Sequence, residues 1–387
     1  MTKRKKIVIL GSTGSIGVSA LDVIGHHPDR FEVLALVAGS NVEALAGQIQ
    51  KFRPRVAVMR EKASAELLKT ALGAKSETKI LWGDEESVAA ATLPEADIVL
   101  SAIVGAAGLK PTYAALKAGK TVALANKESL VAAGPVMTQA LKEGKGMLIP
   151  VDSEHSAIHQ VLHGSDKEVL RIILTASGGP FRTWSAEQIA KATLDEALQH
   201  PKWKMGAKIT IDSATMMNKG LEIIEAHWLF ALPSEKIAVK VHPQSIIHSL
   251  VEYVDGSVLA QLGNPDMRTP IVYALAYPER ITTNVEPLDL VKMSPLSFEE
   301  PDPVRFPALS LARQALEMGG SAPCSLNAAN EVAVEAFLQK KVSFMDIAHI
   351  VGKVLATHRS YPLHSLEDVL EADTSARKEA QTFIKEI

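Results

Sequence analysis

The chain has 387 residues, enough for two or three domains of ordinary size. Its 41 basic and 44 acidic side chains give a formal net charge of −3, and 47% hydrophobic residues with 22% charged ones indicate a folded globular protein rather than a disordered one. The near-even charge and the 5% aromatic content argue against a nucleic-acid partner, because nucleic-acid proteins usually carry a basic excess and stacking aromatics.

The first 150 residues alternate short apolar runs with amphipathic segments. The apolar runs show no polar alternation, which is typical of strands covered on both faces of a parallel sheet. A β-α alternation of this kind predicts a doubly wound, Rossmann-like α/β nucleotide domain over residues 1–150. The expected strands are 6–10, 31–38, 55–59, 97–101, 121–125 and 147–151.

After Asp152 the pattern changes to that of an α+β catalytic domain, expected over residues 151–277. A mixed or largely antiparallel sheet is expected, because Asp255-Gly256 between two β-rich runs is a hairpin signal. The long stretch 178–206 carries two capping-box patterns, starting at Ser185 and Thr193, and is a candidate flap. The expected elements are strands at 169–176, 208–212, 236–241, 246–253 and 257–262 and a helix at 214–230.

Six of the twenty prolines fall within residues 278–307. Proline removes a backbone donor and fixes φ, so this segment is expected to be an extended linker. Residues 308–387 then form a C-terminal helical domain. Its expected helices are 308–318, 326–339, 344–358 and 365–384.

Targeting and redox signals point to a soluble, cytoplasmic protein. The basic start is followed by only four apolar residues, 7–10, which fits a buried strand better than a signal peptide. No apolar run approaches the ~18–20 residues of a membrane span. The single cysteine, Cys324, excludes an intrachain disulfide and a cysteine-based zinc cluster, and we expect it to be structural.

A glycine-rich turn, G-x-x-G-x-x-G from Gly11 to Gly17, lies between the first strand and the first predicted helix. Its N–H groups, at Thr13, Gly14, Ser15 and Ile16, are placed to bind a pyrophosphate. About 22 residues further on, Ser40 and Asn41 stand where an NAD site usually has Asp or Glu, which favours NADPH. The turn has no arginine or lysine, and Ser40-Asn41 could instead simply cap the next helix.

Three carboxylates make a candidate metal site. Asp152 and Glu154 follow a strand and, in extended chain, point to the same side, while Glu222 lies on a predicted helix. An all-oxygen set suits Mg²⁺ or Mn²⁺ rather than zinc, although a solvated surface turn would explain the same pattern. His155, His159 and His163 recur every four residues, and we interpret them as a mixed helix surface.

Four polar residues form a candidate phosphate cradle. Ser177 precedes two glycines, Ser213 is expected to open a helix, and Asn218 and Lys219 lie one turn before Glu222. Singly, each residue could be a cap or an exposed polar group.

Together the motifs closely resemble the 1-deoxy-D-xylulose 5-phosphate reductoisomerase family. The resemblance runs in order from Gly11 to Glu331, and it implies NADPH- and divalent-metal-dependent isomerisation and reduction of 1-deoxy-D-xylulose 5-phosphate to 2-C-methyl-D-erythritol 4-phosphate, in the non-mevalonate route to isoprenoids. One departure from the family is Ser40, where many members carry a basic residue. The strings that match are GSTGSIG, NKES, VDSEH, ASGGPF, HPKWKMG, DSATMMNKGLE, HPQSIIHS, LGNPDMRTP and NAANEV.

The resemblance also implies residue roles. Catalysis is expected to involve Lys127, Asp152, Glu154, Glu222 and His200, the three carboxylates as metal ligands. The expected substrate contacts are Ser153, Glu154, Ser177, His200, Trp203, Met205, Ser213, Asn218, Lys219 and Glu222, of which His200, Trp203 and Met205 belong to the flap. The expected NADPH contacts are Thr13, Gly14, Ser15, Ile16, Gly39, Ser40, Asn41, Asn126 and Glu128. A homodimer is expected from the resemblance alone.

Two other functions compete with this one. An NADP-dependent semialdehyde or homoserine dehydrogenase would share only the nucleotide domain, and the semialdehyde type needs a cysteine nucleophile that Cys324 is badly placed to provide. A non-catalytic NADP sensor would leave the carboxylates and the phosphate cradle without a role.

Overall fold

The computed structural model describes residues 4–73, 76–164, 167–203 and 205–387. The chain divides into two compact units. The first comprises Met1–Ser129, Met137–Ser156 and Asp266–Val285, and the second Leu130–Val136, Ala157–Pro265 and Glu286–Ile387. The division into three domains that the sequence suggests stays a prediction.

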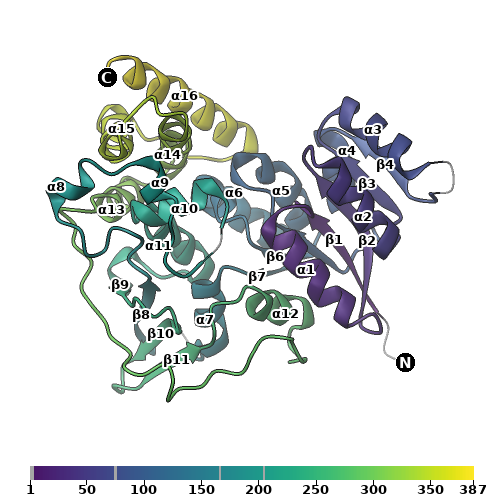
Figure 1. Cartoon of the computed structure of the whole chain (residues 1–387), viewed down its shortest axis with the longest axis horizontal. Helices are drawn as coiled ribbons and strands as arrows, with labels where there is room; N and C mark the ends of the chain where they lie inside the picture. Colours follow the sequence, from purple (N-terminus) through teal and green to yellow (C-terminus); the bar gives the residue numbers. More distant parts are fainter. Residues whose placement is uncertain (1–3, 74–75, 165–166, 204) are drawn as a thin grey trace. The chain divides into compact units, whose positions relative to one another are not determined.

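The first unit is built on a seven-stranded sheet in the order β4-β3-β2-β1-β5-β6-β7, in which every pair is parallel (Figure 1). This is the doubly wound α/β architecture that the sequence predicts, with the reversal of strand order between β1 and β5. The strands are β1 Lys5–Leu10, β2 Phe31–Ala38, β3 Val56–Met59, β4 Lys79–Trp82, β5 Ile98–Ser101, β6 Thr121–Leu124 and β7 Met147–Pro150. The helices are α1 Ser15–His26, α2 Val42–Phe52, α3 Lys62–Leu72, α4 Asp84–Ala91, η1 Gly105–Gly108, α5 Leu109–Lys117 and α12 Arg268–Ala276, and parts of α6 Glu128–Gly144 and α7 Ser153–Val161.

Helix α12 was not predicted, and it belongs to this unit although the sequence places it within the expected catalytic domain. Its residues 271–276 are buried in the core of the parallel sheet. The Lys5 ammonium donates to the last carbonyls of the helix, those of Leu275 (3.1 Å), Ala276 (3.2 Å) and Tyr277 (3.0 Å). A cation there satisfies free acceptors and favours the negative end of the helix dipole, so α12 is tied to β1 despite their distance in sequence.

The second unit contains a mixed four-stranded sheet in the order β11-β10-β8-β9. β8 and β9 are parallel, whereas β10 pairs antiparallel with both β8 and β11, as the hairpin signal predicts. The strands are β8 Val169–Ala176, β9 Ile237–Val241, β10 Ile247–Tyr253 and β11 Val258–Leu262. The helices are α8 Ala186–Ile189, α9 Leu194–Ala197, α10 Ala207–Ala214, α11 Met217–Phe230, η2 Ser234–Lys236, α13 Ala308–Met318, α14 Ala322–Leu338, α15 Phe344–Thr357 and α16 Leu366–Lys385.

The strand expected at 208–212 is wrong, because these residues form helix α10. The alternation of polar and β-branched residues there is typical of a strand. In the structure, Lys208 and Asp212 pair along the helix at 2.9 Å, and Ile211 and Asp212 are buried. Tertiary packing therefore overrides the local strand preference.

The C-terminal helices confirm the expected helical region and pack into the core of the second unit. The rings of Phe181 and Phe344 lie edge to face with centroids 4.9 Å apart, and Phe337 contacts Phe344 at 5.8 Å. The proline-rich segment lacks helix and strand over 278–307 apart from a bridge between Val241 and Glu299, as expected of an extended linker.

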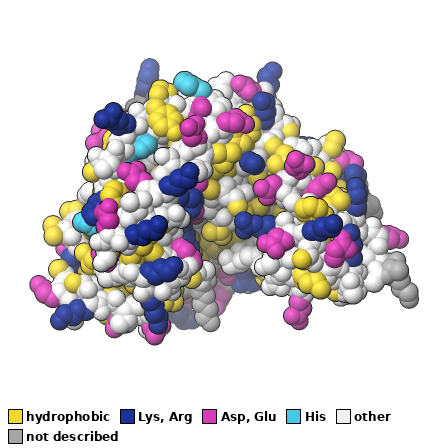
Figure 2. All heavy atoms as spheres, turned by 90° about the horizontal axis from the view of Figure 1, so that it is seen from above, with side chains coloured by type: hydrophobic (Ala, Val, Ile, Leu, Met, Phe, Trp, Pro, Cys, Tyr) yellow, Lys and Arg dark blue, Asp and Glu magenta, His cyan; other side chains and the backbone are white. Residues whose placement is uncertain are grey.

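Cys324 lies inside α14 and not in a turn as its Pro-Cys-Ser context suggests. Burial raises the pKa of its thiol, and Sγ lies 3.5 Å from the carbonyl of Val369, so a structural role is supported. Among the residues that the structure describes, no helix is long and apolar enough to cross a membrane. Basic and acidic side chains are interspersed over the face drawn in Figure 2.

Gly17 should tolerate no side chain. A Cβ there would lie 2.4 Å from the carbonyl oxygen of Gly11, whereas Gly47, on α2, has nothing within 4 Å of its own Cβ position. We expect Gly17→Ala to destabilise the protein by about 1–3 kcal/mol and Gly47→Ala to stabilise it by about 0.5–1 kcal/mol. Chemical denaturation of both variants measures this, and equal stabilities would contradict the tight turn.

Candidate active site

The turn after β1 is shaped by two close backbone approaches. Gly11 has φ +89°, and a Cβ there would meet the carbonyl oxygen of Ala102 at 2.5 Å. The carbonyl of Ser12 accepts from Gln48 Nε2 at 2.8 Å, which fixes the turn. Gly14 and Ser15 at the start of α1 are exposed, and Thr13 and Ile16 are half-buried. The first N–H groups of a helix have no partner within it, so they are available to an anion here.

Ser12 Oγ is an orphaned polar atom in the same turn. It is buried and has no hydrogen-bond partner among the described residues. A buried hydroxyl without a partner costs free energy, which a bound polar ligand would recover. Two features of the predicted nucleotide turn therefore suit a phosphate-bearing cofactor. They are the N–H groups at the start of the helix and the unsatisfied hydroxyl of Ser12.

At the end of β2, Gly39, Ser40 and Asn41 are exposed. Asn41 is the N-cap of α2, and its Oδ1 accepts from the N–H of Ala44 at 3.0 Å. The capping role considered above is thus present for Asn41, and it leaves the side-chain NH₂ of Asn41 free to face a ligand.

The side chain of Asn126 links two segments of the first unit by hydrogen bonds. Its Nδ2 donates to the carbonyls of Ile103 and of Gly105, the latter at 3.0 Å, and its Oδ1 accepts from the N–H (2.9 Å) and the hydroxyl of Ser129. The side chain is buried and its donors and acceptor are occupied. A cofactor contact by Asn126 would therefore use its main chain, while its side chain holds the turn after β5 against the start of α6.

The carboxyl ends of β6 and β7 bring Lys127 and Asp152 together. The two strands are neighbours, with Leu124 opposite Pro150. The Lys127 ammonium contacts Asp152 Oδ2 at 2.5 Å, and Lys127 is 5% exposed. A lysine in contact with a carboxylate favours its charged form.

Asp152 and Glu154 lie at the start of α7 and not in extended chain, so the geometric reason given for their pairing is wrong. Asp152 Oδ1 accepts from the N–H of Glu154 at 3.2 Å, and Glu154 Oε2 accepts from Ser153 Oγ at 2.7 Å. The two carboxylates nevertheless approach each other, with one oxygen of each within 4.8 Å. This spacing suits a shared hard cation.

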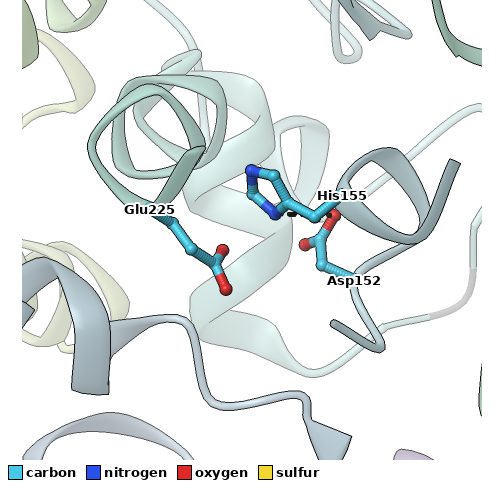
Figure 3. Close-up of side chains that lie close together, drawn as sticks. All are labelled: Asp152, His155 and Glu225. Carbon is cyan, nitrogen blue, oxygen red and sulfur yellow. Dashed lines mark ion pairs between the residues drawn. The ribbon is translucent and has the colours of Figure 1, made fainter. Parts of the chain in front are cut away.

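His155 is fully buried, so its interpretation as helix surface is wrong. Its Nδ1 lies 3.8 Å from Asp152 Oδ1, one turn along the same helix start (Figure 3). The sequence signal was available as the spacing Asp-x-x-His at a predicted strand exit. His159 is half-buried and burial lowers its pKa, while His163 lies past the end of α7.

Ser177 follows β8 in a turn whose glycines have positive φ. Gly178 has φ +84° and Gly179 φ +68°, and a Cβ on Gly179 would lie 2.6 Å from the carbonyl oxygen of Ser213. Ser177 Oγ accepts from the N–H of Gly179 at 3.2 Å. The turn is therefore packed against the last turn of α10, and this brings together the predicted phosphate residues Ser177 and Ser213.

Ser213 does not open a helix as expected, because it lies near the end of α10 and the next helix, α11, begins at Met217. Asn218 and Lys219 lie in the first turn of α11. Asn218 Nδ2 donates to Glu222 Oε1 at 2.6 Å, and the Lys219 ammonium donates to Glu222 Oε2. Glu222 is fully buried and Lys219 is 4% exposed, so the ammonium is the buried counter-charge of this carboxylate.

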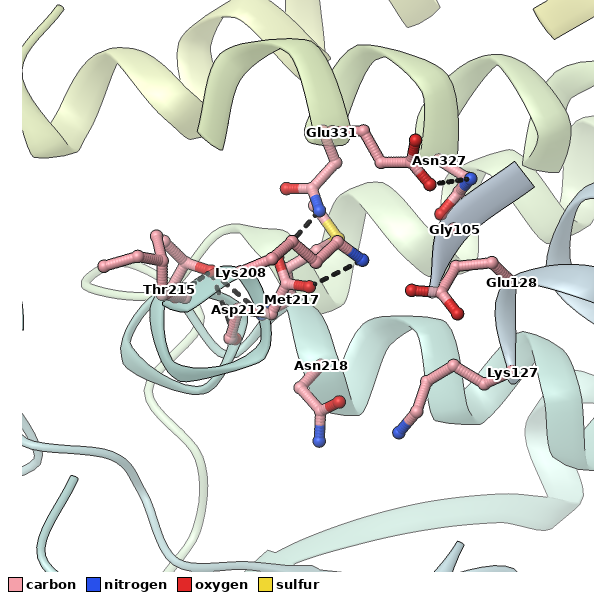
Figure 4. Close-up of polar contacts among 12 residues, drawn as sticks. Gly105, Lys127, Glu128, Lys208, Asp212, Thr215, Met217, Asn218, Asn327 and Glu331 are labelled. Atoms are coloured by element: carbon pink, nitrogen blue, oxygen red, sulfur yellow. Dashed lines mark hydrogen bonds and ion pairs between the residues drawn. The ribbon is translucent and has the colours of Figure 1, made fainter. Parts of the chain in front are cut away.

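A buried polar network that sequence reasoning missed holds α10 in place (Figure 4). Asp212 pairs with Lys208 on its own helix and accepts from Asn330 Nδ2, on α14, at 2.8 Å. Asp212 and Asn330 are both buried. Because Ser213 is the next residue, this network fixes the backbone of Ser213. No local pattern links positions 212 and 330, so single-sequence reasoning had no signal for it.

His200 reaches Ser177 from the predicted flap. Its Nδ1 accepts from the N–H groups of Lys202 (3.2 Å) and Trp203 (2.9 Å), so this nitrogen carries no proton. Nε2 is then protonated in the neutral ring and donates to Ser177 Oγ at 3.0 Å. Burial lowers the pKa of His200 from 6.5 to about 4, so the ring is neutral at physiological pH.

Most of the stretch 178–206 is anchored. Both predicted capping boxes, at Ser185 and Thr193, are confirmed. Phe181, Ile189 and Ala197 are buried in the core of the second unit. By contrast, none of the described residues in 199–206 is buried; this part contains His200, Trp203 and Met205, and Lys204 lies outside the described residues.

Known proteins match this chain along nearly its whole length. The family model described as 1-deoxy-D-xylulose 5-phosphate reductoisomerase matches residues 7–134. The model of the C-terminal domain of that enzyme matches residues 148–230, and a model described as the DXP reductoisomerase C-terminal domain matches residues 262–379. The reductoisomerase of Chlorobium chlorochromatii is 56% identical over 381 residues, which is 98% of this chain and 100% of the relative. The chain belongs to this reductoisomerase family.

Solved structures of reductoisomerases agree with this membership. The Zymomonas mobilis enzyme in complex with NADPH is 50% identical, has a TM-score of 0.94 and is matched over 100% of both chains. A reductoisomerase in complex with NADPH, fosmidomycin and magnesium is 45% identical with a TM-score of 0.93 over 98% of both chains. The Chlorobaculum tepidum reductoisomerase is 57% identical over 98% of this chain and 100% of the relative.

The protonation state of His200 is testable by NMR. We expect a neutral ring protonated on Nε2 that does not titrate between about pH 5.5 and 8.5, measured with ¹⁵N-edited imidazole spectra and assigned by the signal lost in His200→Gln. Because its folded pKa of about 4 lies below 6.5, the contribution of His200 to stability is complete above pH 6.5 and is lost as the pH falls toward 4. A titration midpoint near 6.5 would contradict the partial burial of the ring and its hydrogen bonds to Trp203 and Ser177.

Proposed function

We propose that this chain catalyses the NADPH- and divalent-metal-dependent isomerisation and reduction of 1-deoxy-D-xylulose 5-phosphate to 2-C-methyl-D-erythritol 4-phosphate. The observation that carries the proposal is membership of the family over 98% of the chain, and the lysine-paired carboxylates at two of the predicted metal positions support it. A semialdehyde dehydrogenase is disfavoured, because Cys324 is fully buried and its thiol has a raised pKa.

The metal ligands in this proposal are Asp152, Glu154 and Glu222. Asp152 and Glu154 belong to the first unit and Glu222 to the second. All three offer hard oxygen donors, and Asp152 and Glu154 are spaced for one ion, so the set fits Mg²⁺ or Mn²⁺. A metal held by these residues would polarise the substrate carbonyl and stabilise developing oxyanion charge.

The substrate phosphate is assigned to Ser177, Ser213, Asn218 and Lys219. The N-cap of α11 is Met216, whose side chain makes no capping bond, and Thr215 Oγ1 accepts from the N–H of Met217 at 3.2 Å. The positive end of the helix dipole at this helix start favours an anion. Lys219 adds a positive charge, and the neutral His200 adds no further charge but holds the hydroxyl of Ser177. The phosphate therefore meets one ammonium, hydroxyls and helix N–H groups.

The other substrate contacts are assigned by position. Lys127 lies beside Asp152, where its ammonium can donate to substrate oxygens, and Ser153 is hydrogen-bonded to Glu154. The half-buried Trp203 and Met205 would cover the substrate and exclude water when residues 199–206 close.

NADPH is assigned to the turn after β1, with Thr13, Gly14, Ser15 and Ile16 at the pyrophosphate. Gly39, Ser40 and Asn41 would lie at the adenosine ribose, and Asn126 and Glu128 nearer the nicotinamide. The cofactor supplies the hydride for the reductive step, and these residues bind and orient it.

Assembly and location remain part of the proposal. A homodimer is expected from the family resemblance, and a cytoplasmic location from the single cysteine. Light scattering of the purified protein tests the first, and a mass of one chain at micromolar concentration would refute it.

The carboxylate of Glu222 is tested by Glu222→Gln, which keeps the shape of the side chain and removes its charge. We expect metal-dependent oxidation of NADPH, followed at 340 nm with Mn²⁺ and substrate, to fall by roughly a thousandfold. NADPH affinity should stay within about twofold of the parent, because the cofactor residues are elsewhere. Glu235→Gln, an exposed residue of η2, is the matched control and should be fully active. Undiminished turnover in Glu222→Gln would remove Glu222 from the metal site.

Lys219 is tested separately through substrate affinity. We expect Lys219→Gln to raise KM for the sugar phosphate by about ten- to a hundredfold, since one charged hydrogen bond to phosphate is lost. The exposed Lys191 serves as the control, and Lys191→Gln should leave KM unchanged. A parental KM in Lys219→Gln, measured at saturating metal, would exclude it from the phosphate site.

A further inference from the structure

Arg60 lies directly beside the turn that follows β2. Strands β2 and β3 are paired in register, with Ala38 opposite Met59. Each chain continues past its strand end, and the N–H of Arg60 donates to the carbonyl of Gly39 at 3.3 Å. Arg60, the first residue after β3, therefore lies opposite Gly39, the residue that precedes Ser40 and Asn41.

The turn itself offers neutral donors only. Ser40 contributes a hydroxyl, and Asn41 contributes its NH₂ because its Oδ1 is used to cap α2. In a dinucleotide site this strand end lies at the adenosine ribose, where NADPH carries a phosphate and NADH a hydroxyl. A phosphate bears about −1.5 to −2 charges near neutral pH. The hydroxyl of Ser40 and the amide of Asn41 are neutral, so they provide no counter-charge for it.

The guanidinium of Arg60 is available for this purpose. The residue is exposed, and within the described part of the chain its side chain has no hydrogen bond or ion pair. Among the described residues, neither Glu61, at the N-cap of α3, nor Glu43, in the first turn of α2, is paired with it, and Glu66 pairs with Lys69. An arginine that is neither buried nor paired can turn its planar fork toward a phosphate and bind two of its oxygens.

We propose that Arg60 binds the 2′-phosphate of NADPH and is the residue that makes this chain prefer NADPH over NADH. The basic group that the turn at Ser40 lacks is then supplied from the neighbouring strand. The proposal rests on the proposed function, since it assigns a contact to that cofactor. Arg60 touches only the phosphate that distinguishes the two dinucleotides, so its removal should affect NADPH and spare NADH.

The test is Arg60→Gln with dissociation constants measured by calorimetry for NADPH and NADH. We expect the constant for NADPH to rise about ten- to a hundredfold, which corresponds to the loss of a charge-assisted pair, and the constant for NADH to stay within about twofold. Arg60→Lys should recover part of the NADPH affinity, because a point charge remains without the bidentate fork. The matched control is Arg53→Gln, an exposed arginine before the opposite end of β3, which should change neither constant.

Adenosine 2′,5′-bisphosphate and adenosine 5′-monophosphate give the same comparison without the nicotinamide. Arg60→Gln should weaken only the bisphosphate. Equal weakening of all ligands, or an unchanged constant for NADPH, would overturn the assignment of Arg60 while leaving the proposed function standing. Parent protein that binds neither dinucleotide would refute the proposed function itself, so the two failures are distinguishable.

Discussion

The carboxylates proposed for the active site are paired with lysines of their own units. Asp152 lies against Lys127, and Glu222 lies against Lys219 and Asn218. A buried carboxylate without a counter-charge would cost several kcal/mol or take up a proton, and a protonated carboxyl is a poor ligand for a hard cation. The lysines compensate the charge of the carboxylates at the proposed metal site and also compete for the same oxygens, so a metal would have to bind several carboxylate oxygens at once to displace them.

Parallel topology explains why chemistry-bearing residues from distant parts of the sequence meet within the first unit. Lys127 follows β6 and Asp152 follows β7, and because these strands run side by side in the same direction their exits are adjacent. The same argument applies to Gly11 after β1 and Ala102 after β5, whose contact forces glycine at position 11. Loops at the carboxyl ends can vary in sequence while the sheet keeps their order.

Much of this arrangement could be predicted from sequence, since it follows from local patterns. Uninterrupted apolar runs predict the central strands, and the spacing of hydroxyl and carboxamide or carboxylate groups predicts the capping boxes at Ser185 and Thr193. Strand β4 was not predicted, because it is an edge strand with exposed ends, Lys79 and Trp82, and so lacks the apolar run of a central strand. The strand expected at 208–212 failed because Asp212 is stabilised by Asn330, more than a hundred residues away, and no local pattern contains that contact.

The phosphate residues depend on main-chain geometry as much as on side-chain identity. Ser177 is oriented by two successive residues with positive φ, Gly178 and Gly179, and the second approaches the carbonyl of Ser213 too closely for any Cβ. Ser213 is in turn held by the buried Asp212 next to it. Recognition of the individual serines by type therefore finds the donors but not the reason they converge. That reason is steric: a turn that only glycine can make packs closely against the end of a helix, and a buried hydrogen bond from Asn330 to Asp212 fixes the position of that helix.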